Sequence, residues 1–287
     1  MDAWDPKAGL EPTTIPYSRG IPQVTKTLAH LTPMNDANRL EDIFKVHGHT
    51  IAAMLIEPMM GNCCAISTTT EFLQLARSLC DKYGVLLIID EVKTGFRVAK
   101  GGVQSLHNIR PDISTFAKAM ANGYPIAAIG GREDVMRMFR YGGAAHGGTY
   151  TAHSVSLAAA ERCLQILDET PALETIAIYG EKLKSGIKTI LDRRNIVHSF
   201  SGHSSMFGLF FAPNPPIDYR AWKKSDYGFY DTLALHMQDH GIICEPDSRE
   251  PLFMCEAHDQ TCLEDTLRAF EIAVDLTLEQ IEGEKRA

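Results

Sequence analysis

Two side chains of opposite charge stand at the ends of apolar segments. Asp90 ends the run 85–90, the clearest buried strand in the sequence, and Lys118 ends the short segment 112–118. In open α/β sheets, ligands bind outside the carboxyl ends of the strands. If the two segments are neighbouring parallel strands, we expect Asp90 and Lys118 on the same rim of one sheet.

A lysine and a carboxylate placed in this way suit pyridoxal phosphate (PLP). The lysine amine can hold the aldehyde of this cofactor as a Schiff base. A buried aspartate beside the pyridine nitrogen keeps that nitrogen protonated, so that the ring can act as an electron sink. The spacing alone leaves two simpler interpretations open, because an aspartate often caps the turn after a strand and a lysine beside a glycine turn is commonly solvated.

The elements that must position these residues alternate between strands and helices. We expect a loop over 1–33, strands at 50–56, 85–90, 112–117 and 126–129, a helix from Asn35 or Asp36 to Val46, and a helix from the cap Thr70 to Gly84. This order predicts an α/β fold with a largely parallel sheet.

The pattern changes to α+β after a boundary near Pro171. A helix at 151–167 comes before it, and helices at 173–193, 227–240 and 263–281 with strands at 204–211 and 242–244 follow. We therefore expect a large cofactor-binding domain over 1–170 and a small C-terminal domain over 171–287.

The composition excludes several classes of function. The chain has 287 residues, a net charge of -8 and no cluster of Lys and Arg, so neither nucleic acid nor an anionic membrane is an expected partner. No apolar run reaches the roughly 18 residues of a membrane span, and the acidic start lacks a secretory signal. Seven cysteines, an odd number without a C-x-x-C motif, indicate a reducing compartment, and we expect a cytoplasmic protein.

Two other kinds of site are disfavoured. His236 and His240 have the spacing of metal ligands on a helix, but no third ligand stands nearby, and we expect no metal. A nicotinamide-dependent oxidoreductase fits the α/β order. It requires a G-x-G-x-x-G fingerprint after a strand, which no Gly-Gly pair of this sequence opens.

The run Asp90–Arg97 resembles the Asp-Glu-Val-x-Thr-Gly-Phe-Arg signature of class III aminotransferases. Three further segments resemble that family in the same order: Ile56–Pro58 with Gly61-Asn62, Pro111–Lys118 followed by Asn122–Ile126, and His146–Tyr150. Within the family, Phe96–Val98, Gly101–Gln104 and Glu250 before Leu252-Phe253 are most similar to the glutamate-1-semialdehyde aminomutase-like branch. The resemblance extends from end to end of this chain.

The resemblance implies roles for six residues. It implies that Lys118 binds PLP and moves the proton, that Asp90 pairs with the pyridinium nitrogen, and that Val92 packs on one face of the ring. It also implies that Asn62 lies near the ring hydroxyl, that Thr149 binds the cofactor phosphate of the neighbouring subunit, and that Glu250 is the gate at the entrance. A homodimer is implied because the family's active sites lie between subunits.

The resemblance also implies the type I fold of PLP-dependent transferases, N-terminally incomplete in this chain. The implied activity is that of a PLP-dependent aminotransferase, which moves an amino group between an amine or amino acid donor and a carbonyl acceptor. An aminomutase, which performs both halves on one substrate, uses the same chemistry and stays an alternative.

The sequence also departs from the family. A Gly-Ser/Thr-Glu-Ala phosphate loop and an aromatic-His-Gly segment do not occur, and the N-terminal third of the family pattern is absent. A truncated sequence, a second chain that supplies the rest, and a non-catalytic homologue are three open explanations. Lys93 stands where Met or Gln is usual, and His153 stands where the aminomutase-like branch has Asn. Arg97 and Arg132 are candidate partners of a substrate carboxylate, but structural ion pairing is the favoured role for both.

Overall fold

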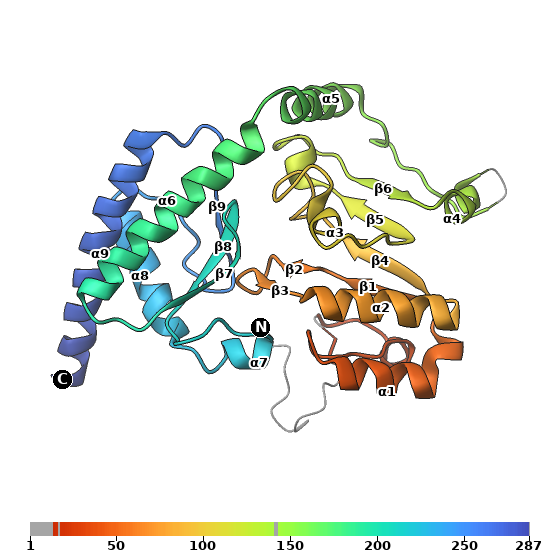
Figure 1. Cartoon of the computed structure of the whole chain (residues 1–287), viewed down its shortest axis with the longest axis horizontal. Helices are drawn as coiled ribbons and strands as arrows, with labels where there is room; N and C mark the ends of the chain where they lie inside the picture. Colours follow the sequence, from red (N-terminus) through yellow and green to blue (C-terminus); the bar gives the residue numbers. More distant parts are fainter. Residues whose placement is uncertain (1–13, 17, 141–142, 287) are drawn as a thin grey trace.

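The computed structural model describes residues 14–16, 18–140 and 143–286. They form a larger N-terminal unit and a smaller C-terminal unit, and the chain passes from one to the other between helices α5 (Ser154–Glu169) and α6 (Ala172–Arg193) (Figure 1). In the described part of the chain, no helix is long and apolar enough to cross a membrane.

A four-stranded sheet forms the centre of the larger unit. Its strand order is β1 (Ala53–Ile56), β4 (Leu86–Asp90), β5 (Ile113–Phe116) and β6 (Ala128–Gly131). The pairs β1–β4 and β4–β5 are parallel, whereas β6 runs antiparallel to β5. The largely parallel α/β sheet predicted from the sequence is therefore present, although β6 begins two residues later than predicted.

Helices α1 (Ala37–His47) and α2 (Thr70–Tyr83) pack against each other beside this sheet (Figure 1). Their apolar residues and those of β4 form one core, because alternate β4 residues such as Leu87 and Ile89 point into it. The other helical elements of this unit are short: η2 (Gln23–Leu28), η3 (Gly48–Thr50), α3 (Gly102–Leu106), η4 (Lys118–Met120), α4 (Glu133–Met136) and η5 (Arg137–Phe139).

The caps of the two helices agree only in part with the prediction. Asp36 caps α1, and its carboxylate accepts a hydrogen bond from Arg39 N at 3.0 Å. The cap of α2 is Thr69 and not the predicted Thr70, because the Thr69 hydroxyl accepts from Phe72 N at 3.1 Å. Gly84 ends α2 with a left-handed φ of 70°, which glycine adopts without a steric cost.

The C-terminal unit packs an antiparallel sheet against long helices. The sheet order is β7 (Ser199–His203), β8 (Met206–Phe210) and β9 (Leu252–Phe253), and the helices are α6, α7 (Tyr219–Trp222), α8 (Tyr227–Asp239) and α9 (Gln260–Arg286). The strand predicted at 242–244 is wrong. Ile243 is 98% exposed, and the edge of the sheet is occupied by β9 instead.

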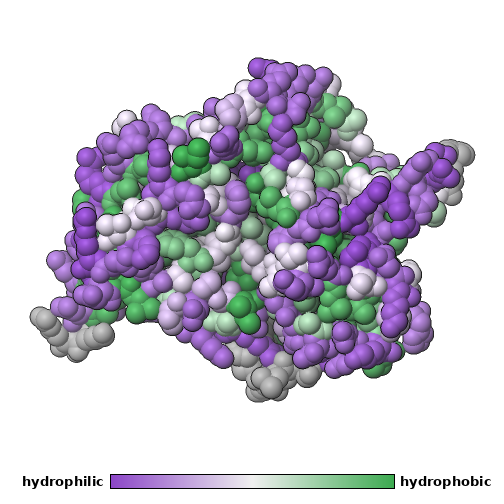
Figure 2. All heavy atoms as spheres, viewed as in Figure 1, coloured by the Kyte–Doolittle hydropathy of each residue, from purple (hydrophilic) through white to green (hydrophobic). Residues whose placement is uncertain are grey.

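A hairpin of the larger unit, β2 (Met59–Met60) with β3 (Ile66–Ser67), forms the seam between the two units. Cys64 N donates to Arg249 O at 2.5 Å, and Cys64 O accepts from Ser201 Oγ at 2.5 Å. Figure 2 shows mainly hydrophilic residues along the margin of this face and apolar residues at several places between them.

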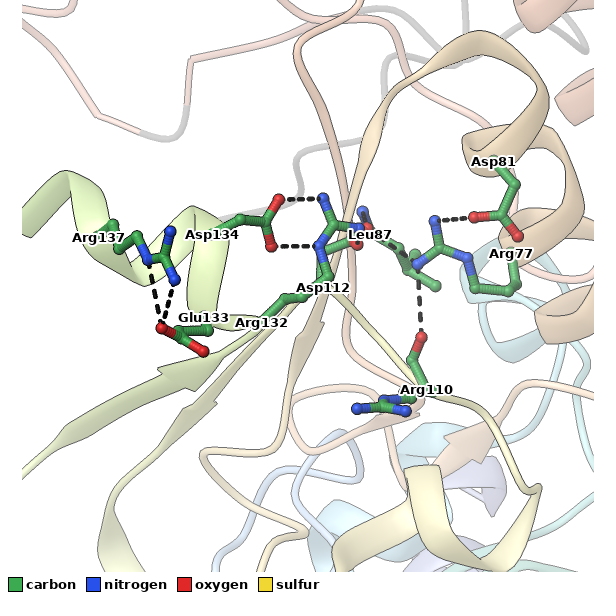
Figure 3. Close-up of polar contacts among 9 residues, drawn as sticks. All are labelled: Arg77, Asp81, Leu87, Arg110, Asp112, Arg132, Glu133, Asp134 and Arg137. Carbon is green, nitrogen blue, oxygen red and sulfur yellow. Dashed lines mark hydrogen bonds and ion pairs between the residues drawn. The ribbon is translucent and has the colours of Figure 1, made fainter.

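A buried ion network fixes the amino-terminal edge of the main sheet (Figure 3). Asp112, which is 3% exposed, precedes β5 and accepts from Leu87 N at 2.7 Å and from Arg77 Nη1 at 2.9 Å. Arg132, which follows β6, donates to the other oxygen of Asp112 and also pairs with Asp134. The carboxylate of one aspartate thus ties α2, β4, β5 and the end of β6 together.

Candidate active site

Three charged residues follow three neighbouring strands at the opposite, carboxyl-terminal edge. Glu57 comes directly after β1, Asp90 ends β4, and Lys118 lies two residues beyond β5. The register pairs Ile56 with Ile89 and Asp90 with Thr115, so the strand ends are level. The sheet therefore brings Asp90 and Lys118 to one rim, as the sequence predicted, and adds Glu57 beside them.

The carboxylate of Asp90 is held in place by one of its two oxygens. Oδ1 accepts hydrogen bonds from Val92 N at 2.9 Å and from Thr115 Oγ1 at 3.1 Å. Among the described residues, none donates to Oδ2. Asp90 therefore acts as the cap of the turn after β4, and it also keeps one oxygen available to a ligand.

Lys118 sits in a backbone conformation that is uncommon for a residue with a side chain. Its φ is +45°, in the left-handed region, where a non-glycine residue is strained by about 1 kcal/mol. The turn is anchored by the buried Met120 and Ala121 and by Cys163, whose thiol donates to Ala119 O at 3.3 Å. The side chain of Lys118 is exposed, and its amine makes no hydrogen bond or ion pair within the described ranges.

Glu57 is a half-buried carboxyl that the sequence analysis quoted in a motif without giving it a role. It accepts from Gly61 N at 2.8 Å. Burial raises the pKa of Glu57 above its ordinary value of 4.5, the Gly61 hydrogen bond opposes this shift, and the nearby Asp90 adds to it. Lys93 and Lys118 lower the same pKa, which places both cations in its electrostatic neighbourhood. The signal that could have identified Glu57 is its position directly after the apolar run of β1.

Asn62 and Glu250 are brought together by Lys93, the residue that departs from the family signature. Lys93 Nζ donates to Asn62 Oδ1, to Gly61 O at 2.6 Å and to Glu250 Oε2 at 2.9 Å. Asn62 belongs to the loop of the β2–β3 hairpin, whereas Glu250 belongs to the C-terminal unit. The contact between Lys93 and Glu250 could not be predicted from the sequence, because these two residues are 157 positions apart.

The loop after β4 is shaped by Glu91, a buried acid that the sequence analysis did not single out. Its oxygens accept from Val103 N at 3.1 Å and from Gln104 N at 2.8 Å, and the Thr94 hydroxyl donates to it as well. Glu91 thereby supplies hydrogen-bond partners for the amides at the start of α3. Val92, between Asp90 and this loop, is half-buried.

Thr149 is not brought to this rim by any contact of the described residues. It lies in an exposed segment before α5, in which Tyr150 is 82% exposed. The hydrogen bonds of this segment are local, such as Thr151 N to Gly148 O at 3.0 Å.

The two arginines considered as carboxylate partners differ in position. Arg132 belongs to the ion network of the amino-terminal edge, so the structural ion pairing predicted for it is confirmed. Arg97 lies in the loop after β4, where its Nη1 donates to Met254 O at 2.8 Å. Among the described residues no carboxylate pairs with it, so the ion pairing expected for Arg97 is not observed. Burial lowers the pKa of Arg97.

The two histidines with metal-ligand spacing have other partners. His236 Nε2 contacts Gln280 Oε1 at 3.2 Å, and His240 Nδ1 donates to His236 O at 2.8 Å. Within the described residues, no group of three or more His, Cys, Asp and Glu side chains is placed to hold a metal ion.

A family model described as aminotransferase class-III matches residues 6–269. The glutamate-1-semialdehyde 2,1-aminomutase of Herminiimonas arsenicoxydans is 35% identical over 255 residues, which are 88% of this chain and 60% of that protein. The corresponding protein of Aquifex aeolicus is 32% identical over 268 residues, 93% of this chain and 63% of that protein. The chain thus spans about 60% of the length of the curated relatives it matches.

Solved structures agree with this similarity. An omega-transaminase from Sphaerobacter thermophilus superposes with a TM-score of 0.87 at 28% identity, over 93% of this chain and 61% of that chain. The FumI protein of Sphingopyxis sp. MTA144, in its PLP internal aldimine form, superposes with a TM-score of 0.82 at 29% identity, over 93% and 62% of the two chains. The predicted type I fold of PLP-dependent transferases is therefore confirmed.

Proposed function

The chain belongs to the class III aminotransferase family, and we propose that it is a PLP-dependent aminotransferase, which moves an amino group between an amine or amino acid donor and a carbonyl acceptor. The observation that carries this proposal is the rim formed by Asp90 and Lys118. One residue there offers an amine that makes no hydrogen bond or ion pair within the described part of the chain, and the other offers a fixed carboxylate oxygen.

The ring end of PLP fits these residues. Asp90 Oδ2 can accept a hydrogen bond from a protonated ring nitrogen while Oδ1 stays bound to the loop, so the carboxylate is oriented before the cofactor arrives. In the proposal, Val92 packs on one ring face and Asn62 lies near the ring hydroxyl. When bound, PLP supplies an electron sink for the electron pair released at the substrate carbon.

Lys118 is the proposed catalytic base and acid. Its exposed amine can bind the cofactor and, once the substrate amine has taken its place, can accept a proton from the substrate carbon and return it to another carbon. Glu57 lies beside this rim, where burial and the charge of Asp90 disfavour its ionised form. The turn that carries Lys118 is fixed by the buried Met120 and Ala121.

The assembly and the division of the chain are part of the same proposal. We propose a homodimer in which Thr149 binds the cofactor phosphate of the partner subunit, and its supporting observation is the exposure of Thr149 and Tyr150. We propose a large domain over 1–170 and a small domain over 171–287, supported by the separate sheets of the two units.

The proposed location is the cytoplasm, and the proposed substrates are small amino and keto compounds. All seven cysteines fall in the described ranges, and each of them is free, which fits a reducing compartment.

An aminomutase is the second candidate, and the observation in its favour is the name of the curated relatives. It would use the same residues on one substrate that both gives and receives the amino group. A reaction that proceeds on glutamate-1-semialdehyde without any separate acceptor would favour this candidate over the aminotransferase.

The function is tested with the purified chain, PLP, an amine donor and a keto acid acceptor, by measuring the aminated acceptor. Lys118→Ala should lower the rate at least about a hundredfold, the usual contribution of a positioned acid or base. Lys100→Ala is the matched control, because Lys100 pairs with the exposed Asp168 and not with the rim. A folded wild-type chain that binds PLP but transfers no amino group would instead support a non-catalytic homologue.

A further inference from the structure

Lys93 has the complete set of hydrogen-bond partners that an ammonium group can take. Its three donors are matched by three acceptors from two loops: Gly61 O, Asn62 Oδ1 and Glu250 Oε2. Its side chain is only 13% exposed, and that of Glu250 is 31% exposed. A lysine that is buried and satisfied in this way is part of a built site rather than of a solvated surface.

The position of the Lys93 stem depends on Gly61. A Cβ added to Gly61 would lie 1.9 Å from Lys93 Cδ, so the lysine passes through space that only glycine leaves open. Lys93 and Gly61 therefore fit each other closely.

A second cation holds the same segment of the C-terminal unit. Arg97 Nη1 donates to Met254 O at 2.8 Å, and its Cζ lies 5.1 Å from the centre of the Phe253 ring. Lys93 Nζ lies 5.7 Å from the centre of that ring. The stretch 250–254 is thus held against two cations of the loop that follows Asp90.

The amide of Asn62 is oriented by Lys93. Because Oδ1 accepts from the ammonium, Nδ2 is directed away from it, and its two N–H groups make no hydrogen bond within the described ranges. An ammonium and an amide donor fixed side by side are a suitable pair for a carboxylate. In this structure, the carboxylate in contact with the ammonium is that of Glu250, which comes from a loop without regular secondary structure.

We propose that Lys93 and Asn62 form a carboxylate-binding subsite of the proposed enzyme, in which Glu250 takes the place of a substrate carboxylate. The inference rests on the proposed function and names its substrate class: amino acids and keto acids rather than amines without a carboxylate. Lys93 is then a specificity-determining residue. In place of the Met or Gln of the family, it supplies the positive charge that binds the carboxylate. Binding of the substrate carboxylate displaces Glu250 from Lys93.

The test is a titration of the purified chain with ¹³C-labelled propionate, observed by NMR, with propanamide as the uncharged probe. Glu250→Gln removes the competing charge and should tighten propionate binding about tenfold, whereas Lys93→Met should weaken it about tenfold or more, the usual loss for a hydrogen bond to a charged group. Lys100→Met is the matched control and should bind propionate as the wild type does. Propanamide should not bind.

A second readout follows the displaced segment. Propionate should increase amide hydrogen exchange over residues 247–254 of the wild type and leave exchange in α9 unchanged. In the PLP-loaded enzyme, Lys93→Met should raise KM for L-alanine and leave KM for ethylamine, which lacks the carboxylate, within about twofold.

The outcomes separate this proposal from the proposed function. A folded Glu250→Gln variant that fails to bind propionate overturns the subsite, even if Lys93→Met does not fold. Equal propionate affinity of the wild type and a folded Lys93→Met variant also overturns it. Neither measurement of propionate requires PLP. Propionate binding without aminotransferase activity would therefore leave the subsite standing and contradict only the proposed function.

Discussion

The two edges of the main sheet carry the same kinds of residue and use them differently. At the amino-terminal edge, both oxygens of Asp112 are bound, and its partners Arg77 and Arg132 each make further bonds (Figure 3). At the carboxyl-terminal edge, one oxygen of Asp90 and the whole amine of Lys118 stay unengaged by the described residues, and Glu57 has a raised pKa. The paired groups of the amino-terminal edge hold the strands together, whereas the unengaged groups of the carboxyl-terminal edge are placed to bind a ligand.

The largest expected effect is a loss of stability at the amino-terminal edge. Asp112→Asn removes the charge that pairs with two arginines, and it should lower the free energy of unfolding by about 3–5 kcal/mol, because breaking a buried ion pair leaves its partner uncompensated. Urea unfolding measures this loss. Asp134→Asn, at an exposed partner of Arg132, is the control and should cost less than about 1 kcal/mol. Equal losses of unfolding free energy for Asp112→Asn and Asp134→Asn would contradict the larger effect expected for the buried carboxylate.

The corresponding substitution at the carboxyl-terminal edge, Asp90→Asn, should lower activity rather than stability. Asp90→Asn keeps an acceptor for Val92 N and Thr115 but loses the charge, so amino-group transfer should fall on the order of a hundredfold. Unfolding in urea should change by less than about 0.5 kcal/mol. A variant that is destabilised but fully active would show that Asp90 is only a turn cap.

A smaller loss of stability is expected from a change in helix α2, which positions Arg77 beside Asp112. Thr69→Ala removes the N-cap and should cost about 1 kcal/mol of stability, measured by thermal or urea unfolding. Thr69→Ser is the matched control, because it keeps the hydroxyl that accepts from Phe72 N. If Thr69→Ser lost as much stability as Thr69→Ala, the assignment of the cap to the Thr69 hydroxyl would be wrong.

The smallest effect concerns pH. The raised pKa of Glu57 means that the folded state binds a proton more tightly than the unfolded state. The stability from this group is therefore fully present below its ordinary pKa of 4.5 and is lost as pH rises through the raised value. Glu57→Gln should abolish this part of the pH dependence, and should gain stability relative to the wild type as pH rises. An unchanged pH profile in urea unfolding would contradict the assignment.

Much of the rim could be predicted from the sequence, because strand ends are local features. The apolar runs before Asp90 and Lys118 identified two strands, and parallel pairing placed their ends at one edge. The strand β7 was missed because Ser-Phe-Ser-Gly-His lacks an alternating apolar pattern. The strand expected at 242–244 was predicted from three residues, too few to distinguish a strand from an exposed loop.

The contacts between distant segments could not be predicted. Lys93 appeared in the sequence only as a departure from the family signature. Its partner Glu250 is supplied by the C-terminal unit, and the fit of its stem depends on the missing side chain of Gly61. The roles of Val92, Asn62 and Thr149 toward PLP stay predictions, since they rest on the resemblance.

The most direct measurement is reduction of the PLP-treated chain with borohydride, followed by peptide mapping of the labelled lysine. The visible spectrum before reduction shows whether the cofactor is bound, and Lys118→Ala serves as the control. The account predicts a yellow protein in which the label lies on Lys118 and is absent from the variant. A label on another lysine, or a folded chain that stays colourless with excess PLP, would contradict it.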